Sequence, residues 1–548
     1  MTLTPCDFSG GKKRLPSTRN LMSLNLKQQF RSPFLIICNI TILLCFVLYE
    51  LVILGAGVKF INYIAQFDKL VYLELVVIII SFCYSVYAVQ LPISLEVACL
   101  YNKSQIYIVR MISVLISSSV LYLIPIVYAI IGAVIQRADK LFCIYSLLYV
   151  FLRWFLIICT SDVVAMVLTV VLKRNVAYLF SAPWMVFSSY LNERIIARII
   201  PNIYLSKKVS ALISMQIPFV DAISIDYTGP RIDAFFLAKI QYVIVGIVLL
   251  FCLLWLLLSK KKSALFVVLF LSVLELISCW KWIDRFPIPY DDESKIYELE
   301  EQTQTAHISK YEGEIKIDDV FRVNCCVYID QKEKASTKIK LDECFDIDSI
   351  QYEGMNIEYK RDGDYLILDE TSYDSVSGKP INISYHGRVY YVNNIDVVDV
   401  FSSRISCALP AHFAFLPMIS GDKSRKDFNF KVTAHNTIIS NLNTKKIDKT
   451  TYRLYGHATT CSLFSDFLSE YSRDGIVFYR AKYNLITDYD DIYCEMKTSI
   501  GINGYNKELV SNYSKPEKVF MIYSIYGTVG LPIIYDNYVL INYGFDTE

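Results

Sequence analysis

Long apolar runs fill the first half of the chain, and they limit the possible fold more than any other feature. An α-helix needs about 20 apolar residues to cross a bilayer, and about seven stretches reach or approach that length. No run of this kind follows Pro287. The sequence therefore predicts an α-helical membrane bundle with about seven spans, at Phe34–Ala56, Leu70–Val89, Met111–Ile135, Phe142–Leu172, Val176–Leu191, Phe236–Leu258 and Ala264–Trp280.

Charge divides the chain at nearly the same place. Residues 1–285 carry 26 Lys and Arg against 13 Asp and Glu, whereas the remaining residues carry 28 against 40. An acidic second half disfavours nucleic acid as a partner. These boundaries predict a basic cytoplasmic tail at 1–33, a six-span bundle at 34–260, a seventh span or anchor at 261–286, and a β-rich soluble domain at 287–548.

The basic residues also predict an orientation, because cytoplasmic segments of membrane proteins are enriched in Lys and Arg. With the N-terminal tail inside, Lys173, Arg174 and Lys260–Lys262 fall on the same side of the membrane. Seven spans then place the soluble domain outside the cytoplasm. If one short run enters the membrane and returns without crossing, the soluble domain lies in the cytoplasm instead.

Two segments beside the spans mix apolar and basic residues. Residues 20–34 place several apolar side chains on one helix face, which favours a helix on the cytoplasmic membrane surface. A disordered basic tail is the alternative for this segment. Residues 90–110 form the second segment, between two predicted spans. A longer mixed stretch at 192–235 reads as interfacial or re-entrant helices on the outer face.

This order of elements resembles the membrane subunits of type-2 ABC exporters over roughly residues 20–260, although no diagnostic motif is present. The resemblance implies a separate ATP-binding subunit and a homo- or heterodimer of membrane subunits. It also implies that residues 90–110 dock on the ATPase through a coupling helix. The other reading is an ordinary loop between spans. The expected coupling residues are two apolar contacts and three charged flanks, Leu95, Leu100, Glu96, Lys103 and Arg110.

Charged residues occur inside or near the predicted spans. A charge at mid-bilayer costs about 2.5–3.5 kcal/mol, so such residues face the bundle interior or one another. Arg153 and Asp162 stand nine residues apart on one predicted helix and therefore do not pair along it. They line a translocation path or subunit contact on one reading, and form structural pairs between helices on the other. The residues concerned are Glu50, Glu74, Arg153, Asp162 and Glu275.

The second half has the pattern of an all-β protein. From Ile315 onward, short alternating runs are separated by turn residues, which predicts sandwich-like sheets. Arg361-Asp362-Gly363-Asp364 is a hairpin signal between two such runs.

The phrases LDECFDIDSIQYEG, GKPINISYHGRV, ALPAHFAFLPM, DFNFKVTAHNTIISNL and YRLYGHA follow in order. They resemble the N-terminal β-saddle domain of the aminopeptidase N family of zinc peptidases, over about residues 310–485. The resemblance implies a sheet that faces a peptide or a partner. Its landmarks are Leu409-Pro410-Ala411, Leu416-Pro417 and Ile439-Ser440-Asn441.

The catalytic motif of that family does not occur in this sequence. Its zinc site needs H-E-x-x-H on a helix, whereas no histidine here precedes Glu or has a second histidine four residues on. The phosphate-binding G-x-x-x-x-G-K-[ST], the hydrolase G-x-S-x-G and the C-x-x-C pair are also missing. We therefore predict no catalytic residue, metal or cofactor in this chain, and no enzyme activity.

Together these features predict a permease subunit of an ABC-type exporter in the cell membrane, with membrane lipids as neighbours and a non-catalytic outer β domain. A peptide is the candidate cargo. Two alternatives remain open. One is a membrane-anchored binding or immunity-type protein without transport activity, and the other is a non-catalytic partner of a separate peptidase.

Overall fold

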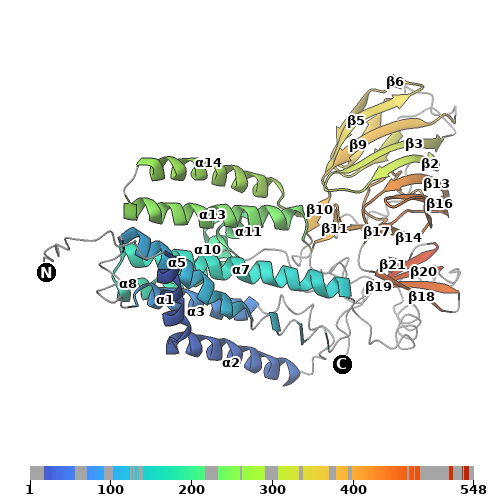
Figure 1. The fold of residues 1–548 in the computed structure, drawn as a ribbon. Coiled ribbons are helices and arrows are strands. Elements are labelled where there is room, and N and C mark those ends of the chain that lie inside the picture. The colour runs from blue at the N-terminus through green and yellow to red at the C-terminus, as the bar shows by residue number, and fades with distance from the viewer. Residues whose placement is uncertain are drawn as a thin grey trace, which may run out of the picture.

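The computed structural model describes residues 18–55, 71–91, 101, 103–123, 126–127, 130–131, 134, 140–189, 191–215, 232–259, 262–289, 306–331, 337–369, 378–392, 398–465, 468–473, 475–481, 517–521, 533–534 and 536–541. Within them, helices occupy the chain up to Asp284 and strands follow from Ile288 (Figure 1). The molecule thus consists of a helical bundle joined to a group of β-sheets.

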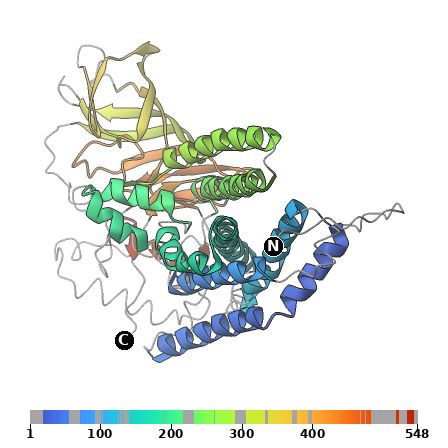
Figure 2. The same ribbon diagram turned by 90° about the vertical axis from the view of Figure 1, so that its left-hand side faces the viewer.

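The helices follow the apolar runs of the sequence. Both views place α2 and α14 on opposite sides of the bundle, with α7 between them (Figures 1 and 2). The long helices are α2 (Pro33–Gly55), α3 (Val71–Val89), α7 (Lys140–Val171), α13 (Ala234–Ser259) and α14 (Lys262–Asp284). The shorter ones are α1 (Thr18–Phe30), α5 (Lys103–Ser118), the 3-10 turn η3 (Ser119–Tyr122), α8 (Arg174–Leu179), α9 (Ser181–Ser188), α10 (Leu191–Ile199) and α11 (Ile203–Ile213).

The prediction of a seven-span bundle is wrong. Only three helices in the described part of the chain are long and apolar enough to cross a membrane, namely Leu147–Val171, Ala234–Leu257 and Ser263–Asp284. The count becomes four if the bent pair Thr18–Phe30 and Pro33–Leu48 is taken as one span. Apolar helices at Leu73–Val89 and Gln105–Leu121 are shorter.

Two of the predicted spans are interrupted in the described part of the chain. The predicted span Met111–Ile135 begins in α5, which ends at Ser118 and continues as the 3-10 turn η3. The predicted span Val176–Leu191 is divided between α8 and α9 by a turn at Phe180.

Four sheets make up the β half within the described residues. The eight-stranded sheet has the order β15 (Asn443–Lys446), β16 (Thr451–Ala458), β13 (Lys426–Thr433), β2 (His307–Lys316), β3 (Phe321–Asp330), β9 (Ile381–Gly387), β5 (Phe345–Tyr352) and β6 (Met355–Asn356). The six-stranded sheet has the order β1 (Ile288–Pro289), β10 (Tyr390–Val392), β11 (Val398–Ser402), β12 (Cys407–Leu409), β17 (Leu463–Ser465) and β14 (Ile439–Ser440).

Two smaller sheets complete this half. The five-stranded sheet contains β18 (Leu468–Arg473), β19 (Ile476–Ala481), β20 (Lys518–Met521), β22 (Tyr538–Ile541) and β21 (Ile533–Ile534). The three-stranded sheet contains β4 (Thr337–Lys340), β8 (Tyr365–Leu368) and β7 (Tyr359–Asp362). The predicted hairpin is confirmed, because Asp362 pairs with Tyr365 across a turn in which Gly363 has a φ of +55°.

Strand alternation builds the core of the β half. Every second residue of β3 points inward, from Phe321 to Ile329, while Arg322 and Asn324 face solvent. This period of two is the spacing of side chains on one face of a strand. The same buried cluster includes Phe235 of α13 and Trp282 of α14.

The two halves meet in an aromatic junction. The Phe235 ring lies 5.7 Å from both the Trp282 and the Tyr390 ring, measured between centroids, and Phe286 packs edge-on against Trp282 at 5.6 Å. Asp233 accepts a hydrogen bond from the Tyr390 hydroxyl at 2.8 Å. Because β1, which pairs with β10, begins four residues after α14 ends, only three residues join helix and sheet.

Replacing Trp282 by Ala tests this junction. Its ring is fully buried, so the cavity left behind should lower the free energy of unfolding by about 3–5 kcal/mol. Trp280 of the same helix is 74% exposed and provides the matched control. Thermal unfolding in mild detergent should show a large loss for Trp282→Ala and little change for Trp280→Ala. Equal losses would mean that the ring does not join the halves.

Candidate functional site in the helical bundle

A buried ion pair joins α3 to α7. Arg153 Nε lies 2.5 Å from Glu74 Oε1, and Arg153 Nη2 donates to Glu74 Oε2 at 3.2 Å. The two side chains are only 5% and 1% exposed. Tyr149 adds a long contact, since its hydroxyl accepts from Arg153 Nη1 at 3.4 Å. The Nη2 contact is a charge-assisted hydrogen bond, which is stronger than one between neutral groups.

A second buried carboxylate belongs to Asp162, farther along α7. It accepts hydrogen bonds from Ser85 of α3 at 2.7 Å and from Ser118 of α5 at 2.5 Å. Asp162 is fully buried, so these hydroxyls supply polar contacts that water does not. The residues therefore tie three helices together at one point.

A chain of hydroxyls extends from this point toward α1. Ser117, next to Ser118, lies 2.6 Å from the Tyr84 hydroxyl and donates to Gln29 Oε1 at 2.9 Å. Gln29 belongs to α1 and is 1% exposed. Polar side chains thus run through the bundle from α7 to α1, inside helices whose outer faces are apolar.

The remaining predicted intramembrane residues lie elsewhere. Glu275 of α14 packs closely against Gly246 of α13. A Cβ atom added to this glycine would lie 3.0 Å from Glu275 Oε1. The side chain of Glu50 lies outside the described residues. Lys239 of α13 was not predicted. It is fully buried, donates to the Ala211 carbonyl at 2.7 Å, and lies 4.4 Å from the centroid of the Trp282 ring.

The predicted coupling segment is only partly described. Leu95, Glu96 and Leu100 lie outside the described residues, and Lys103 begins α5. Arg110 is buried, and it donates to the carbonyls of Val89 at 2.7 Å and of Leu91. A cation at the C-terminal end of a helix satisfies the last carbonyls and the helix dipole. The structure thus places Arg110 against the end of α3, and not on a docking surface.

In the β half, the landmark Asn441 holds strands together. Its Nδ2 donates to the Thr460 carbonyl, and its Oδ1 accepts from the Ser462 amide, both at 2.8 Å. Exposed histidines pair with aspartates on neighbouring strands, as His386 does with Asp348 at 2.9 Å. No group of His, Cys, Asp and Glu in the described part of the chain has the arrangement of a metal site.

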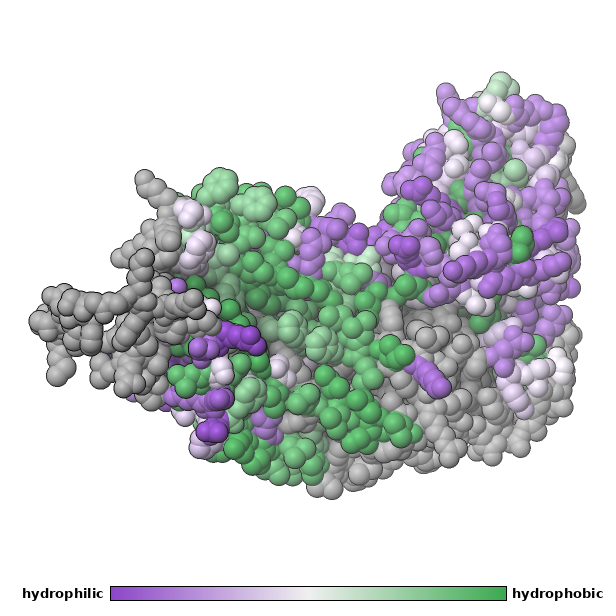
Figure 3. All heavy atoms as spheres, in the orientation of Figure 1, coloured by the Kyte–Doolittle hydropathy of each residue, from purple (hydrophilic) through white to green (hydrophobic). Residues whose placement is uncertain are grey.

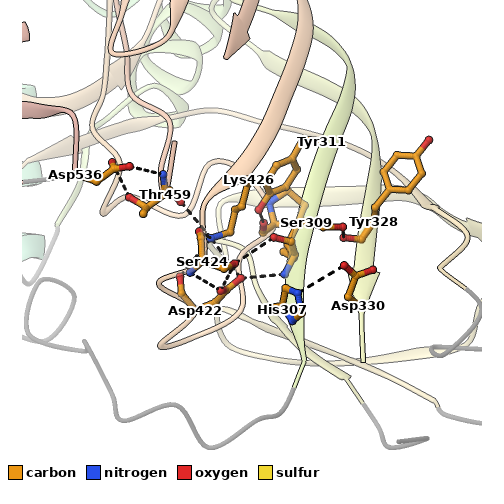
Figure 4. Close-up of polar contacts among 12 residues, drawn as sticks. His307, Ser309, Tyr311, Tyr328, Asp330, Asp422, Ser424, Lys426, Thr459 and Asp536 are labelled. Carbon is orange, nitrogen blue, oxygen red and sulfur yellow. Dashed lines mark hydrogen bonds and ion pairs between the residues drawn. The ribbon is translucent and has the colours of Figure 1, made fainter. Parts of the chain in front are cut away.

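A buried Asp–Lys pair links the start of β2 to the start of β13 (Figure 4). Lys426 Nζ lies 3.3 Å from Asp422 Oδ2 and donates to the carbonyls of Ser424 and Thr459. Burial raises the pKa of Asp422, but hydrogen bonds from Ser424 and the Ile308 amide outweigh it and lower the pKa overall. Burial lowers the pKa of Lys426. The donors and acceptors of this pair are used within the fold, so we assign it a structural role.

Comparison with known proteins gives limited information. No family model and no curated protein matches the sequence. Native yeast LTA4 hydrolase is 10% identical, with a TM-score of 0.31 over 44% of this chain and 42% of its own. An M1 zinc metallopeptidase from Deinococcus radiodurans is 7% identical, with a TM-score of 0.32 over 43% of this chain and 60% of its own.

This chain therefore spans less than half of the first protein and about three fifths of the second. Similarity at these TM-scores carries no argument about fold or activity, so it does not decide the resemblance of the β half. The comparisons give no support to the resemblance of the helical half to ABC permeases.

The ion pair can be tested with a double-mutant cycle. Arg153→Met leaves the Glu74 charge buried, and we expect a loss of about 3–5 kcal/mol in the free energy of unfolding. Adding Glu74→Gln removes that charge and should recover most of the loss. Thermal unfolding of both single variants and the double variant in detergent measures the coupling. Additive losses would show that the two side chains do not interact.

Because His412 is buried, we expect the protein to lose stability in acid. Its Nε2 is buried, and burial lowers the pKa of His412 from 6.5 to about 3. Between these values only the unfolded chain takes up a proton, so stability is full above pH 6.5 and falls as the pH drops toward 3. At pH 4.5, His412→Gln should lose about 2–3 kcal/mol less than the unsubstituted protein, relative to pH 7.

The matched control for this experiment is His435→Gln, because His435 is exposed. Denaturant unfolding at the two pH values should give the same acid loss for this control as for the unsubstituted protein. An unchanged acid loss in His412→Gln would rule out His412 as its source.

Proposed function

We propose that this chain is the membrane subunit of an ABC-type exporter, and that a separate ATPase drives it. The observation that carries the proposal is the buried Glu74–Arg153 pair inside a helical half whose outer surface is apolar. A lipid environment accounts for the outer surface. Movement of a polar cargo accounts for charged groups in the interior.

The apolar surface supports the membrane location. Figure 3 shows apolar residues over the visible helical half and polar residues over the visible β half. Soluble proteins rarely expose continuous apolar patches larger than a few hundred Å². On α14 alone the exposed large apolar side chains are Leu265, Phe266, Leu269, Phe270, Val273, Leu276, Ile277 and Trp280.

The buried polar groups favour transport over simple anchoring. An anchor needs only apolar helices, whereas each charge placed at membrane depth costs free energy. Glu74, Arg153 and Asp162 come from two helices that pack together, and Ser118 brings a third helix to the same region. Ionisable groups that face the interior of a membrane bundle are found along substrate and ion pathways. A peptide is the cargo suggested by the resemblance of the β half.

The position of the basic residues supports a β domain outside the cytoplasm. Ser259, the last residue of α13, lies one helix length, about 39 Å, from the junction with the sheets. Arg174 lies 5.9 Å from the centroid of the Tyr87 ring, and Tyr87 stacks on Phe34 at 4.7 Å. These contacts place α8 and the start of α2 together at the end of the bundle that is far from the sheets (Figure 1). A basic end faces the cytoplasm, which leaves the sheets on the other side.

Cysteine labelling tests this orientation. Glu358 lies exposed in the β half and Asn175 lies exposed on α8. An impermeant thiol reagent should label Glu358→Cys in intact cells, but Asn175→Cys only after lysis. The unsubstituted chain gives the background from native cysteines. The reverse pattern would place the β domain in the cytoplasm.

Affinity purification in mild detergent tests the function itself. A Walker-motif ATPase should co-elute with the full chain, and the double variant Leu95→Asp, Leu100→Asp should release it. Burial of each leucine at an interface contributes about 1.5–3 kcal/mol, so the double change should weaken binding strongly. The control is Met355→Asp, Ile447→Asp, which alters two exposed apolar residues of the β half. Recovery of a peptidase and no ATPase would reject the exporter in favour of a peptidase partner.

A further inference from the structure

A shallow groove of about 410 Å³ runs along one face of α1. Its floor is apolar, formed by Met22, Leu26 and Phe30 at spacings of four residues. Its borders are basic, formed by Arg19, Lys27 and Arg31, and all three of these side chains are exposed. Residues four apart lie on the same side of a helix, so the groove is a continuous strip.

The neighbouring face of α1 is the one that holds it to the bundle. Leu21 packs with Ile106 and Val109 of α5, and Gln29 accepts the hydrogen bond from Ser117. Met22 belongs to both faces, but Leu26, Phe30 and the basic borders take no part in this packing cluster, so the groove is open while α1 stays attached. Phe30 keeps 45% of its surface exposed in this arrangement.

The direction of α1 places the groove at a membrane surface. α1 and α2 are bent by 53° at the break between them, and α1 lies across the end of the bundle (Figure 1). Ile36 and Ile37, at the start of α2, are more than half exposed and apolar. The groove thus ends within about two turns of residues that suit lipid chains.

We propose that this groove binds the headgroup of an anionic phospholipid, with the first methylene groups of an acyl chain on the apolar floor. Charge complementarity selects this occupant, because Arg19 and Lys27 of α1 and Arg31 just after it line the groove, and α1 contains no acidic residue. Basic residues on an amphipathic helix bind anionic headgroups, and apolar residues beside them enter the acyl boundary. The inference rests on the proposed membrane location, but not on transport.

Native mass spectrometry of the full chain in detergent measures this binding. The probes are phosphatidylglycerol and phosphatidylcholine with identical acyl chains, each titrated separately. The unsubstituted protein should bind phosphatidylglycerol more tightly. Each basic residue contributes about fivefold, so Arg19→Gln, Lys27→Gln, Arg31→Gln should weaken phosphatidylglycerol binding by roughly 100-fold. Phosphatidylcholine binding should stay nearly unchanged, whereas Phe30→Gln should weaken both lipids.

The matched control removes the same charge from the β half, in the variant Lys360→Gln, Lys445→Gln, Lys449→Gln, whose three lysines are exposed. It should bind both lipids as the unsubstituted protein does. Retained phosphatidylglycerol preference in the α1 variant, or an equal loss in the control, would overturn the proposal. So would loss of the co-eluting ATPase with lipid affinity unchanged, since the groove would then be a protein-binding surface. The titration measures lipid binding alone, so its result can be interpreted even if the chain is not an exporter subunit.

Discussion

The aromatic contact around Trp282 is the interaction on which the arrangement of both halves depends. Trp282 and Phe235 come from helices, Phe286 follows the end of α14, Tyr390 comes from the sheet, and all of them belong to one buried cluster. Arg388 reinforces this contact, because it donates to the main-chain carbonyls at the end of α14. Burial lowers the pKa of Arg388. The apolar core therefore continues from the helical hairpin into the β half, and the β half is not held by a flexible tether.

Inside the bundle, each buried charge described on α3 and α7 has a specific neighbour. Arg153 meets Glu74, while Asp162 receives two serine hydroxyls. Burying such groups without partners costs several kcal/mol, so the pairs determine how α3, α5 and α7 pack. The same groups that support a transport pathway also fix helix positions. A variant that changes them must therefore be judged on stability before its activity is interpreted.

The sequence predicted local structure well and long-range contacts poorly. Apolar runs located α2, α7, α13 and α14 within a few residues, and a Gly-containing turn located the β7–β8 hairpin. Run length alone overestimated the number of spans, because hydropathy does not register where a helix ends, as α5 does before the 3-10 turn η3 and α8 does at Phe180. Glu74 and Arg153 are 79 residues apart, so their pairing depends on how the helices pack and could not be predicted from the sequence. The same holds for the buried position of Lys239. Arg110 is a basic residue of the kind expected on a docking surface. Its guanidinium instead donates to the Val89 carbonyl at the end of α3.

The parallel pairing of β1 with β10 has a mechanical consequence. The chain passes from α14 into the six-stranded sheet over three residues, Arg285 to Pro287, so no slack separates them. A tilt of the α13–α14 hairpin is then transmitted to the sheets as rotation of a rigid lever. The far edge of the eight-stranded sheet would sweep through a larger arc than the helices themselves. The β half would in this way report the state of the helical half to whatever it meets outside the bundle.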